Sequence, residues 1–192
     1  MGLPLDKSSL KRACYYCYLC WNTTSYLPGC ISKKEMIMKP EIGLQAPDFN
    51  LPADSGMNIS LQDLKGKPVI LYFYPKDDTS GCTAQACQFR DILPDFSGVN
   101  AAILGVSRDG IKSHQKFRDK YSLNFPLLAD ESGEICQKYG VWVEKSMYGR
   151  KYFGIERTTF LIDAAGIIRQ VWSKVKVPGH AEAVLKALES LI

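Results

Sequence analysis

The sequence lacks any apolar run long enough to cross a lipid bilayer. The best candidate, residues 13–21, covers nine residues after a short basic stretch, whereas a membrane-spanning helix needs about 20. No small-x-small cleavage site follows this run cleanly, so the run is not typical of a secretory signal. We therefore expect no membrane partner.

An excess of charge of one sign is also missing. The chain carries a formal net charge of +4, of which residues 1–35 contribute +3. The remaining sequence is nearly neutral and has no basic stripe of the kind that binds phosphate backbones. We therefore expect no nucleic-acid partner.

Histidine is scarce, with only His114 and His180 in the whole chain. Neither lies in a catalytic motif, and an isolated histidine is more often a packing or capping residue than a general base. We therefore expect the chemistry of this protein to rest on other side chains.

Cysteine is comparatively frequent, with seven residues in the chain. An odd number, divided between the N-terminus and the rest, does not resemble a secreted disulfide framework. We therefore expect a reducing, cytoplasmic location; targeting to an organelle or export through the N-terminal segment is the alternative. The cysteines are Cys14, Cys17, Cys20, Cys30, Cys82, Cys87 and Cys136.

The composition changes near Met36, from Cys- and Tyr-rich to regularly patterned. We predict an N-terminal extension over residues 1–37 and a single domain over residues 38–192. The extension is interpreted as disordered, or as sequence upstream of a later start. A targeting segment and a metal site are alternatives, although the cysteine spacing differs from that of bacterial ferredoxins.

Within residues 38–192, hydrophobic patterning predicts alternating strands and helices. Residues 68–75 are continuously apolar, as expected of a strand that is buried on both sides. A helix that buries Phe89, Ile92, Leu93 and Phe96 should follow. The order predicts an α/β fold with a central mixed sheet and helices on both faces. The other predicted elements are short strands near residues 48–52 and 54–60, a strand over 99–107, helices over 111–121, 132–140 and 179–192, and a hairpin over 158–175.

Cys82 follows a loop and should occupy the first turn of the predicted helix. The thiolate is the reactive form of cysteine, and the unpaired N–H groups and dipole at a helix N-terminus favour an anion. Thr79 stands three residues earlier, where its hydroxyl could cap the helix and point toward the sulfur. Pro75 ends the buried strand and directs the loop.

Cys87 lies five residues after Cys82, a spacing that an intact helix cannot bridge. Five residues place the two Cα atoms about 8.6 Å apart, beyond the limit of roughly 7 Å for a disulfide. If the two cysteines form a disulfide, the first turns of the helix must unwind. The alternative is that Cys87 is a small apolar core residue and Cys82 an incidental thiol.

Residues 72–91, YFYPKDDTSGCTAQACQFRD, closely resemble the active-site segment of peroxiredoxins, with the signature Pro75-x-x-x-Thr79-x-x-Cys82. The resemblance to the Q class, also called bacterioferritin comigratory protein, covers about residues 39–188. It includes the segments APDFNLP, FPLLAD, YGVW, GIERTTFLIDAAGIIRQVW and VPGHAEAVLKAL. One departure is Ser80, which stands where the family usually has proline.

The resemblance implies a thioredoxin-like fold and a thiol peroxidase that reduces hydrogen peroxide and organic hydroperoxides. Cys82 would attack the peroxide and become a sulfenic acid, and Cys87 would resolve it as an intramolecular disulfide that thioredoxin reduces. Arg157 would hold the thiolate and the peroxide, Thr79 would hydrogen-bond the sulfur or the substrate, and Pro75 would shield the pocket. No cofactor or metal would be needed.

Three further expectations concern the oligomeric state, Cys136 and the alternative functions. A resolving cysteine in the same chain makes a monomer sufficient. Cys136 is expected to be a packed thiol, because the family signature has no cysteine there. A general disulfide oxidoreductase and a non-enzymatic redox sensor remain as alternative functions on the same fold; beyond residue 36, the absence of C-x-x-C argues against the oxidoreductase.

Overall fold

The computed structural model describes residues 40–93, 100–147 and 149–191. The predicted extension over residues 1–37 and the predicted core position Phe96 lie outside these ranges. Among the described helices, none combines the length and the apolar composition that a membrane span requires.

A mixed five-stranded sheet forms the centre of the domain, in the order β5-β4-β3-β8-β9. Strand β3 is parallel to β4 and antiparallel to β8. All five residues of β3 are buried, as its continuous apolar sequence predicts. The sheet strands are β3 (Val69–Phe73), β4 (Ala102–Ser107), β5 (Leu127–Ala129), β8 (Thr158–Ile162) and β9 (Ile168–Trp172).

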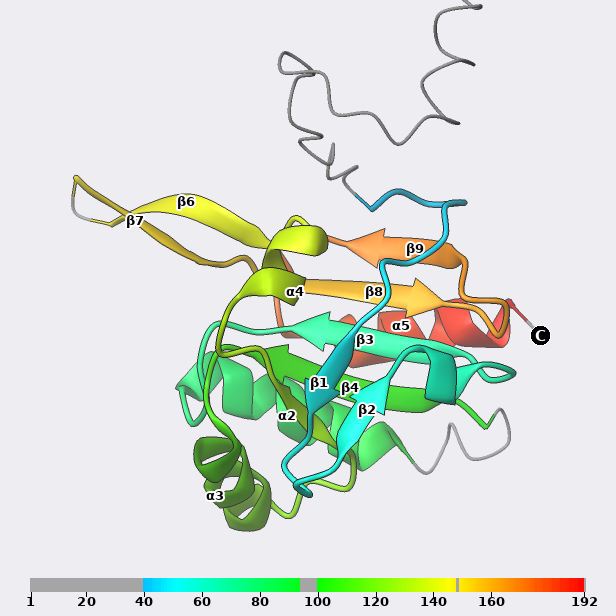
Figure 1. The fold of residues 1–192 in the computed structure, drawn as a ribbon, viewed down its shortest axis with the longest axis horizontal. Helices are drawn as coiled ribbons and strands as arrows, with labels where there is room; N and C mark the ends of the chain where they lie inside the picture. Colours follow the sequence, from blue (N-terminus) through cyan, green and yellow to red (C-terminus); the bar gives the residue numbers. More distant parts are fainter. Residues whose placement is uncertain (1–39, 94–99, 148, 192) are drawn as a thin grey trace, which may run out of the picture. The chain divides into compact units, whose positions relative to one another are not determined.

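Helices cover both faces of this sheet (Figure 1), which confirms the predicted α/β architecture. Buried side chains of α2, α3 and α5 pack on one face. Buried side chains of α4 and of the β1–β2 ribbon pack on the other. The helices are α2 (Ser80–Ile92), α3 (Ile111–Tyr121), α4 (Glu134–Lys138), α5 (His180–Glu189) and a 3₁₀ helix (Gln62–Leu64); the ribbon is β1 (Asn50–Pro52) with β2 (Asn58–Ser60).

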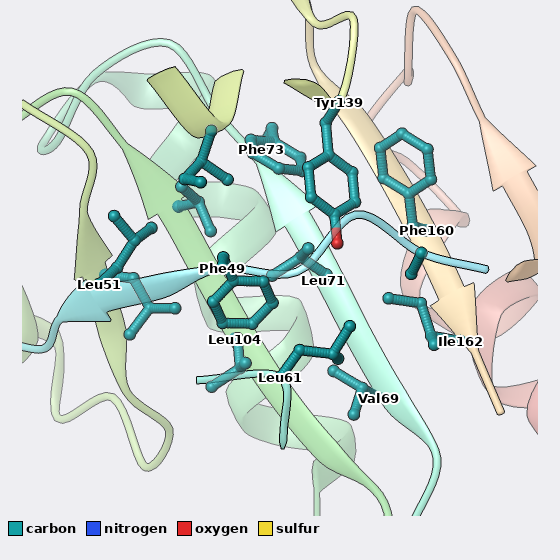
Figure 2. Packing of buried hydrophobic residues seen from close by; sticks show 14 of the residues in the cluster. Phe49, Leu51, Leu61, Val69, Leu71, Phe73, Leu104, Tyr139, Phe160 and Ile162 are labelled. Atoms are coloured by element: carbon teal, nitrogen blue, oxygen red, sulfur yellow. The ribbon is translucent and has the colours of Figure 1, made fainter. Parts of the chain in front are cut away.

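Side chains of β3 alternate between the two hydrophobic layers, because successive residues of a strand point to opposite faces. Val69, Leu71 and Phe73 join the layer shown in Figure 2, where Phe73 and Phe160 lie beside Tyr139. The residues between them join the layer that contains Cys82. The central strand therefore packs into both hydrophobic layers, and Cys82 lies in one of them.

Two features were not predicted from the sequence. Residues 142–155 form an antiparallel hairpin, β6 (Trp142–Met147) with β7 (Arg150–Ile155). The FPLLAD segment, expected only to lead into a helix, contains β5, which extends the sheet beside β4. All three strands depend on pairing with another segment, which periodicity within one segment does not show.

Candidate active site around Cys82

Helix α2 begins two residues before Cys82, so the predicted position in the first helical turn is confirmed. Ser80 is the first helical residue, and Cys82 has only 2% of its surface exposed. The preceding loop leaves the buried strand β3, and its path brings the start of the helix against the sheet. The thiol is thus enclosed while it lies beside the unpaired N–H groups of a helix N-terminus.

Arg157 contacts the Cys82 thiol from a distant part of the chain. Its Nη2 donates a hydrogen bond of 3.3 Å to Cys82 Sγ. Arg157 lies between β7 and β8, so the sheet holds its backbone opposite α2. Gly81 allows the approach, because a Cβ at that position would lie 3.3 Å from Nη2. The structure therefore brings together two of the residues that the sequence singled out.

Gln85 is a site residue that the sequence reasoning missed. Its side chain is buried, and its Oε1 accepts a hydrogen bond of 2.5 Å from Arg157 Nη1. The Gln85 amide nitrogen has no hydrogen-bond partner within the described residues. Gln85 follows Cys82 by three positions, a spacing that places both side chains on one face of a helix. This spacing is the sequence signal that could have identified Gln85 as a site residue.

The expectation that the Thr79 hydroxyl caps α2 is wrong. Thr79 occupies the N-cap position with an extended backbone, but its side chain makes no capping hydrogen bond. Its Oγ1 instead donates to the carbonyl oxygen of Lys76 at 3.1 Å. The Thr79 hydroxyl oxygen can therefore still accept a hydrogen bond from another group. Pro75 is exposed at the loop surface, and its shielding role stays a prediction.

Cys87 lies in the same unbroken helix as Cys82 and is half-buried. Both residues are free thiols in this structure. From helical geometry their Cα atoms are separated by about 8.6 Å, so this conformation holds them apart. A bond between them requires α2 to unwind.

Two further polar groups lie near the Cys82–Arg157 pair. Lys145 of β6 donates from Nζ to the carbonyl oxygen of Ile155 at 2.6 Å. Burial lowers the pKa of Lys145; Arg157 acts in the same direction, whereas Glu156 and Cys82 oppose it. Tyr72 is fully buried, and burial followed by the proximity of Cys82 raises the pKa of its phenol. Sequence reasoning missed Lys145 because it missed the hairpin.

Cys136 is separated from this chemistry. It lies on α4, completely buried in the opposite hydrophobic layer. Burial, with the nearby Asp130 carboxylate, raises the pKa of the Cys136 thiol, so the unreactive thiol form dominates. This environment agrees with the expected packing role.

No group of three or more histidine, cysteine, aspartate or glutamate side chains in the described ranges is arranged to hold a metal ion.

His180, at the start of α5, packs against the helix that carries both cysteines. Its ring contacts Phe89 of α2 edge-on, and Thr159 Oγ1 lies 2.9 Å from its Nε2. Burial, assisted by the positive charge of Arg157, lowers the pKa of His180 to about 4. The imidazole is therefore neutral at physiological pH.

Buried neutral His180 should make the stability of the domain depend on pH. In the unfolded chain it takes up a proton near its ordinary pKa of 6.5, but in the folded protein only near 4. The unfolded state binds more protons between these values, so the free energy of unfolding should decrease as the pH falls through this range. The loss from this group is at most roughly 3 kcal/mol.

Urea denaturation of the wild type and of His180→Gln at pH 7.5 and pH 5 measures this contribution. We expect the wild type to lose more stability than the variant on acidification. Equal losses in the two proteins would show that His180 does not take up a proton on unfolding in this range.

The chain is similar to a known protein family and to several of its members. The model of the AhpC/TSA family matches residues 42–171. The putative peroxiredoxin bcp of Coxiella burnetii is 55% identical over 151 residues, which are 79% of this chain and 100% of that protein. Peroxiredoxin Bcp of Bacillus subtilis is 46% identical over 154 residues, which are 80% of this chain and 98% of that protein.

Solved structures of similar proteins share the fold. A cysteine-to-serine mutant of Xylella fastidiosa PrxQ has a TM-score of 0.75 at 40% identity, covering 79% of this chain and 97% of that chain. The bacterioferritin comigratory protein of Xanthomonas campestris, studied for its alkyl peroxide reduction activity, has a TM-score of 0.72 at 44% identity, covering 74% and 91%. The predicted thioredoxin-like fold is confirmed.

Proposed function

The chain belongs to the AhpC/TSA family and is a thiol peroxidase, and from this premise we propose that Cys82 is its peroxidatic cysteine and Cys87 its resolving cysteine. The observation that carries the proposal is the hydrogen bond from Arg157 Nη2 to Cys82 Sγ in the first turn of α2. A fixed positive charge and a helix N-terminus both favour the thiolate, which is the nucleophile.

In the first step, the Cys82 thiolate attacks one oxygen of a hydroperoxide ROOH. A sulfur–oxygen bond forms as the O–O bond breaks, which leaves a sulfenic acid on Cys82 and releases ROH after protonation of the leaving oxygen. Arg157 stabilises the negative charge as it moves from sulfur to the leaving oxygen. Gln85 orients the Arg157 guanidinium by accepting a hydrogen bond from Nη1, the nitrogen that does not contact Cys82.

In the second step, α2 unwinds and the Cys87 thiol attacks the sulfenic sulfur. A disulfide forms between Cys82 and Cys87, and the sulfenic oxygen leaves as water. The long spacing in the folded helix keeps Cys82 free for peroxide before this step. The helix therefore separates the peroxide-reducing state from the resolved state.

A thiol reductant must then return both cysteines to the reduced form, and we propose thioredoxin for this role. Thiol–disulfide exchange would transfer the disulfide to the reductant through a mixed disulfide. A resolving cysteine in the same chain makes a second subunit unnecessary, which supports a monomer. The need for reduced thiols supports a cytoplasmic location.

Replacing Cys87 with serine tests the resolving role. Purified protein is mixed with thioredoxin, thioredoxin reductase and NADPH, and peroxide-dependent NADPH loss is followed. We expect turnover in Cys87→Ser to fall to about one hundredth of the wild type, because the intramolecular thiol is lost. One round of peroxide reduction should remain, because Cys82 and Arg157 are intact.

Two results would contradict the resolving role. One is thioredoxin-supported turnover in Cys87→Ser at the wild-type rate. The other is loss of the single round of peroxide reduction together with the turnover, which would place Cys87 in the first step instead.

A further inference from the structure

The loop that leads into α2 is held by a buried carboxylate. Asp77, with 7% of its surface exposed, accepts hydrogen bonds from Tyr74 Oη at 2.7 Å, Ser113 Oγ at 2.7 Å and His114 Nδ1 at 2.9 Å. Its backbone N–H donates to Asp109 Oδ2 at 2.8 Å. Both the backbone and the side chain of this loop residue are therefore fixed against the start of α3.

His114, on α3, completes this arrangement from a fully buried position. Its Nδ1 faces the Asp77 carboxylate, and its Nε2 faces the carbonyl oxygen of Leu128 in β5 at 3.2 Å. Each ring nitrogen thus lies within hydrogen-bond distance of an oxygen atom, so Asp77 and Leu128 together fix the orientation of the imidazole ring. A buried hydrogen-bonded pair of this kind is sensitive to removal of either partner, because the remaining polar group is left unsatisfied.

Asp77 meets His114 as a carboxylate. Burial raises the pKa of Asp77, but hydrogen bonds from His114 and Ser113 lower it further than burial raises it. The next residue, Asp78, is also tied to α3, because Lys120 Nζ and Tyr121 Oη donate to its carboxylate at 2.7 and 2.6 Å. The contact of Asp78 with α3 is exposed, so it should contribute less than that of Asp77 to holding the loop in place.

We propose that Asp77 and His114 are positioning residues for the peroxide-reducing step. Only two residues separate Asp77 from the start of α2, and this short segment contains Thr79. By fixing the loop to α3, the pair sets where the first turn of α2 begins, and thus where Cys82 Sγ lies relative to Arg157. The proposal rests on the proposed role of Cys82.

Small displacements of reacting groups have large kinetic effects, since a shift of about 1 Å can lower a rate by around a hundredfold. We expect Asp77→Asn and His114→Gln each to lower the second-order rate constant for oxidation of Cys82 by about tenfold or more. Because the two residues form one pair, the double variant should lose little more than the larger single loss.

The structure offers a matched control in Asp54, another buried carboxylate that anchors α3. Asp54 accepts hydrogen bonds from Arg118 of α3 and from the backbone N–H of Leu127. No hydrogen bond joins it to the loop before α2 within the described residues. Asp54→Asn should therefore lower the melting temperature to a similar extent and leave the peroxide rate within about twofold of the wild type.

The experiment uses the reduced full-length chain and a single addition of hydrogen peroxide. Reaction is stopped at set times by alkylation, and oxidation is read by mass spectrometry on the tryptic peptide 77–90, which contains both cysteines of α2. The rate of Cys82 alkylation by iodoacetamide is measured in parallel. Mispositioning should lower the peroxide rate and leave the alkylation rate unchanged, whereas loss of the folded protein would change both rates.

Peroxide rates in Asp77→Asn and His114→Gln within about twofold of the wild type would overturn the proposal. An equal rate loss in Asp54→Asn would overturn it as well. If the first two variants do not fold, Ser113→Ala removes only one donor to Asp77 and should still slow oxidation; a wild-type rate there would also overturn it. Absence of peptide oxidation in the wild type would instead reject the proposed role of Cys82.

Discussion

Replacing Cys82 with serine is expected to abolish peroxide reduction. A serine hydroxyl is not ionised near neutral pH, and a neutral hydroxyl is a much weaker nucleophile than a thiolate, so serine cannot replace Cys82 in the attack on peroxide. Peroxide-dependent NADPH loss in the thioredoxin-coupled assay should fall by about a thousandfold or more. Because the change replaces one small side chain with another, the far-ultraviolet circular dichroism spectrum should stay the same.

Cys136→Ala is the matched control for this prediction. Cys136 is buried in the other hydrophobic layer, where its thiol is kept protonated, so its loss should affect stability more than turnover. Turnover that persists in Cys82→Ser and disappears in Cys136→Ala would reverse the assignment of the nucleophile.

The second large effect is expected at Arg157. Replacement by glutamine retains a hydrogen-bond donor but removes the positive charge beside Cys82 Sγ. The thiolate loses its fixed counter-charge and the leaving oxygen loses its stabilising group, so the peroxide rate constant should fall by about a hundredfold or more. Single-turnover oxidation of the peptide 77–90 measures this rate without the reductant.

Two further arginine variants define the cause of that loss. Arg157→Lys keeps the charge but loses the two-pronged geometry that reaches Cys82 and Gln85 together, so an intermediate rate is expected. Arg169→Gln removes a surface arginine that pairs with Asp163 and should leave the rate unchanged. A wild-type rate in Arg157→Gln would show that the hydrogen bond to sulfur has no part in catalysis.

The features of the site that depend on local sequence could be predicted. The apolar run before the loop specifies β3, and the helical pattern after it specifies α2, so the place of Cys82 in the first turn follows from neighbouring residues alone. Ser80 also becomes interpretable, because it occupies the first helical position, where proline is favoured. The serine in this chain and the proline of the family therefore suit the same backbone.

The features that depend on distant residues could not be predicted from local patterns. The contact of Asp77 with His114 joins residues 37 positions apart, and His114 was interpreted from the sequence only as an isolated packing or capping residue. Thr79 was correctly placed at the helix start, but its hydroxyl bonds backward to Lys76 instead of forward into the helix. Both N-capping and this turn are local options for threonine, and the sequence alone does not choose between them.

The most direct test of this account is the position of the bond formed after one round of peroxide reduction. The reduced full-length chain is treated with equimolar hydrogen peroxide, its free thiols are alkylated, and the tryptic peptides are analysed by mass spectrometry. Cleavage after Lys76 and Arg90 leaves Cys82 and Cys87 on one peptide. We predict that this peptide resists alkylation and is two hydrogens lighter than its reduced form. A peptide linked instead to Cys136, to an N-terminal cysteine or to a second copy of itself would contradict resolution by unwinding of α2.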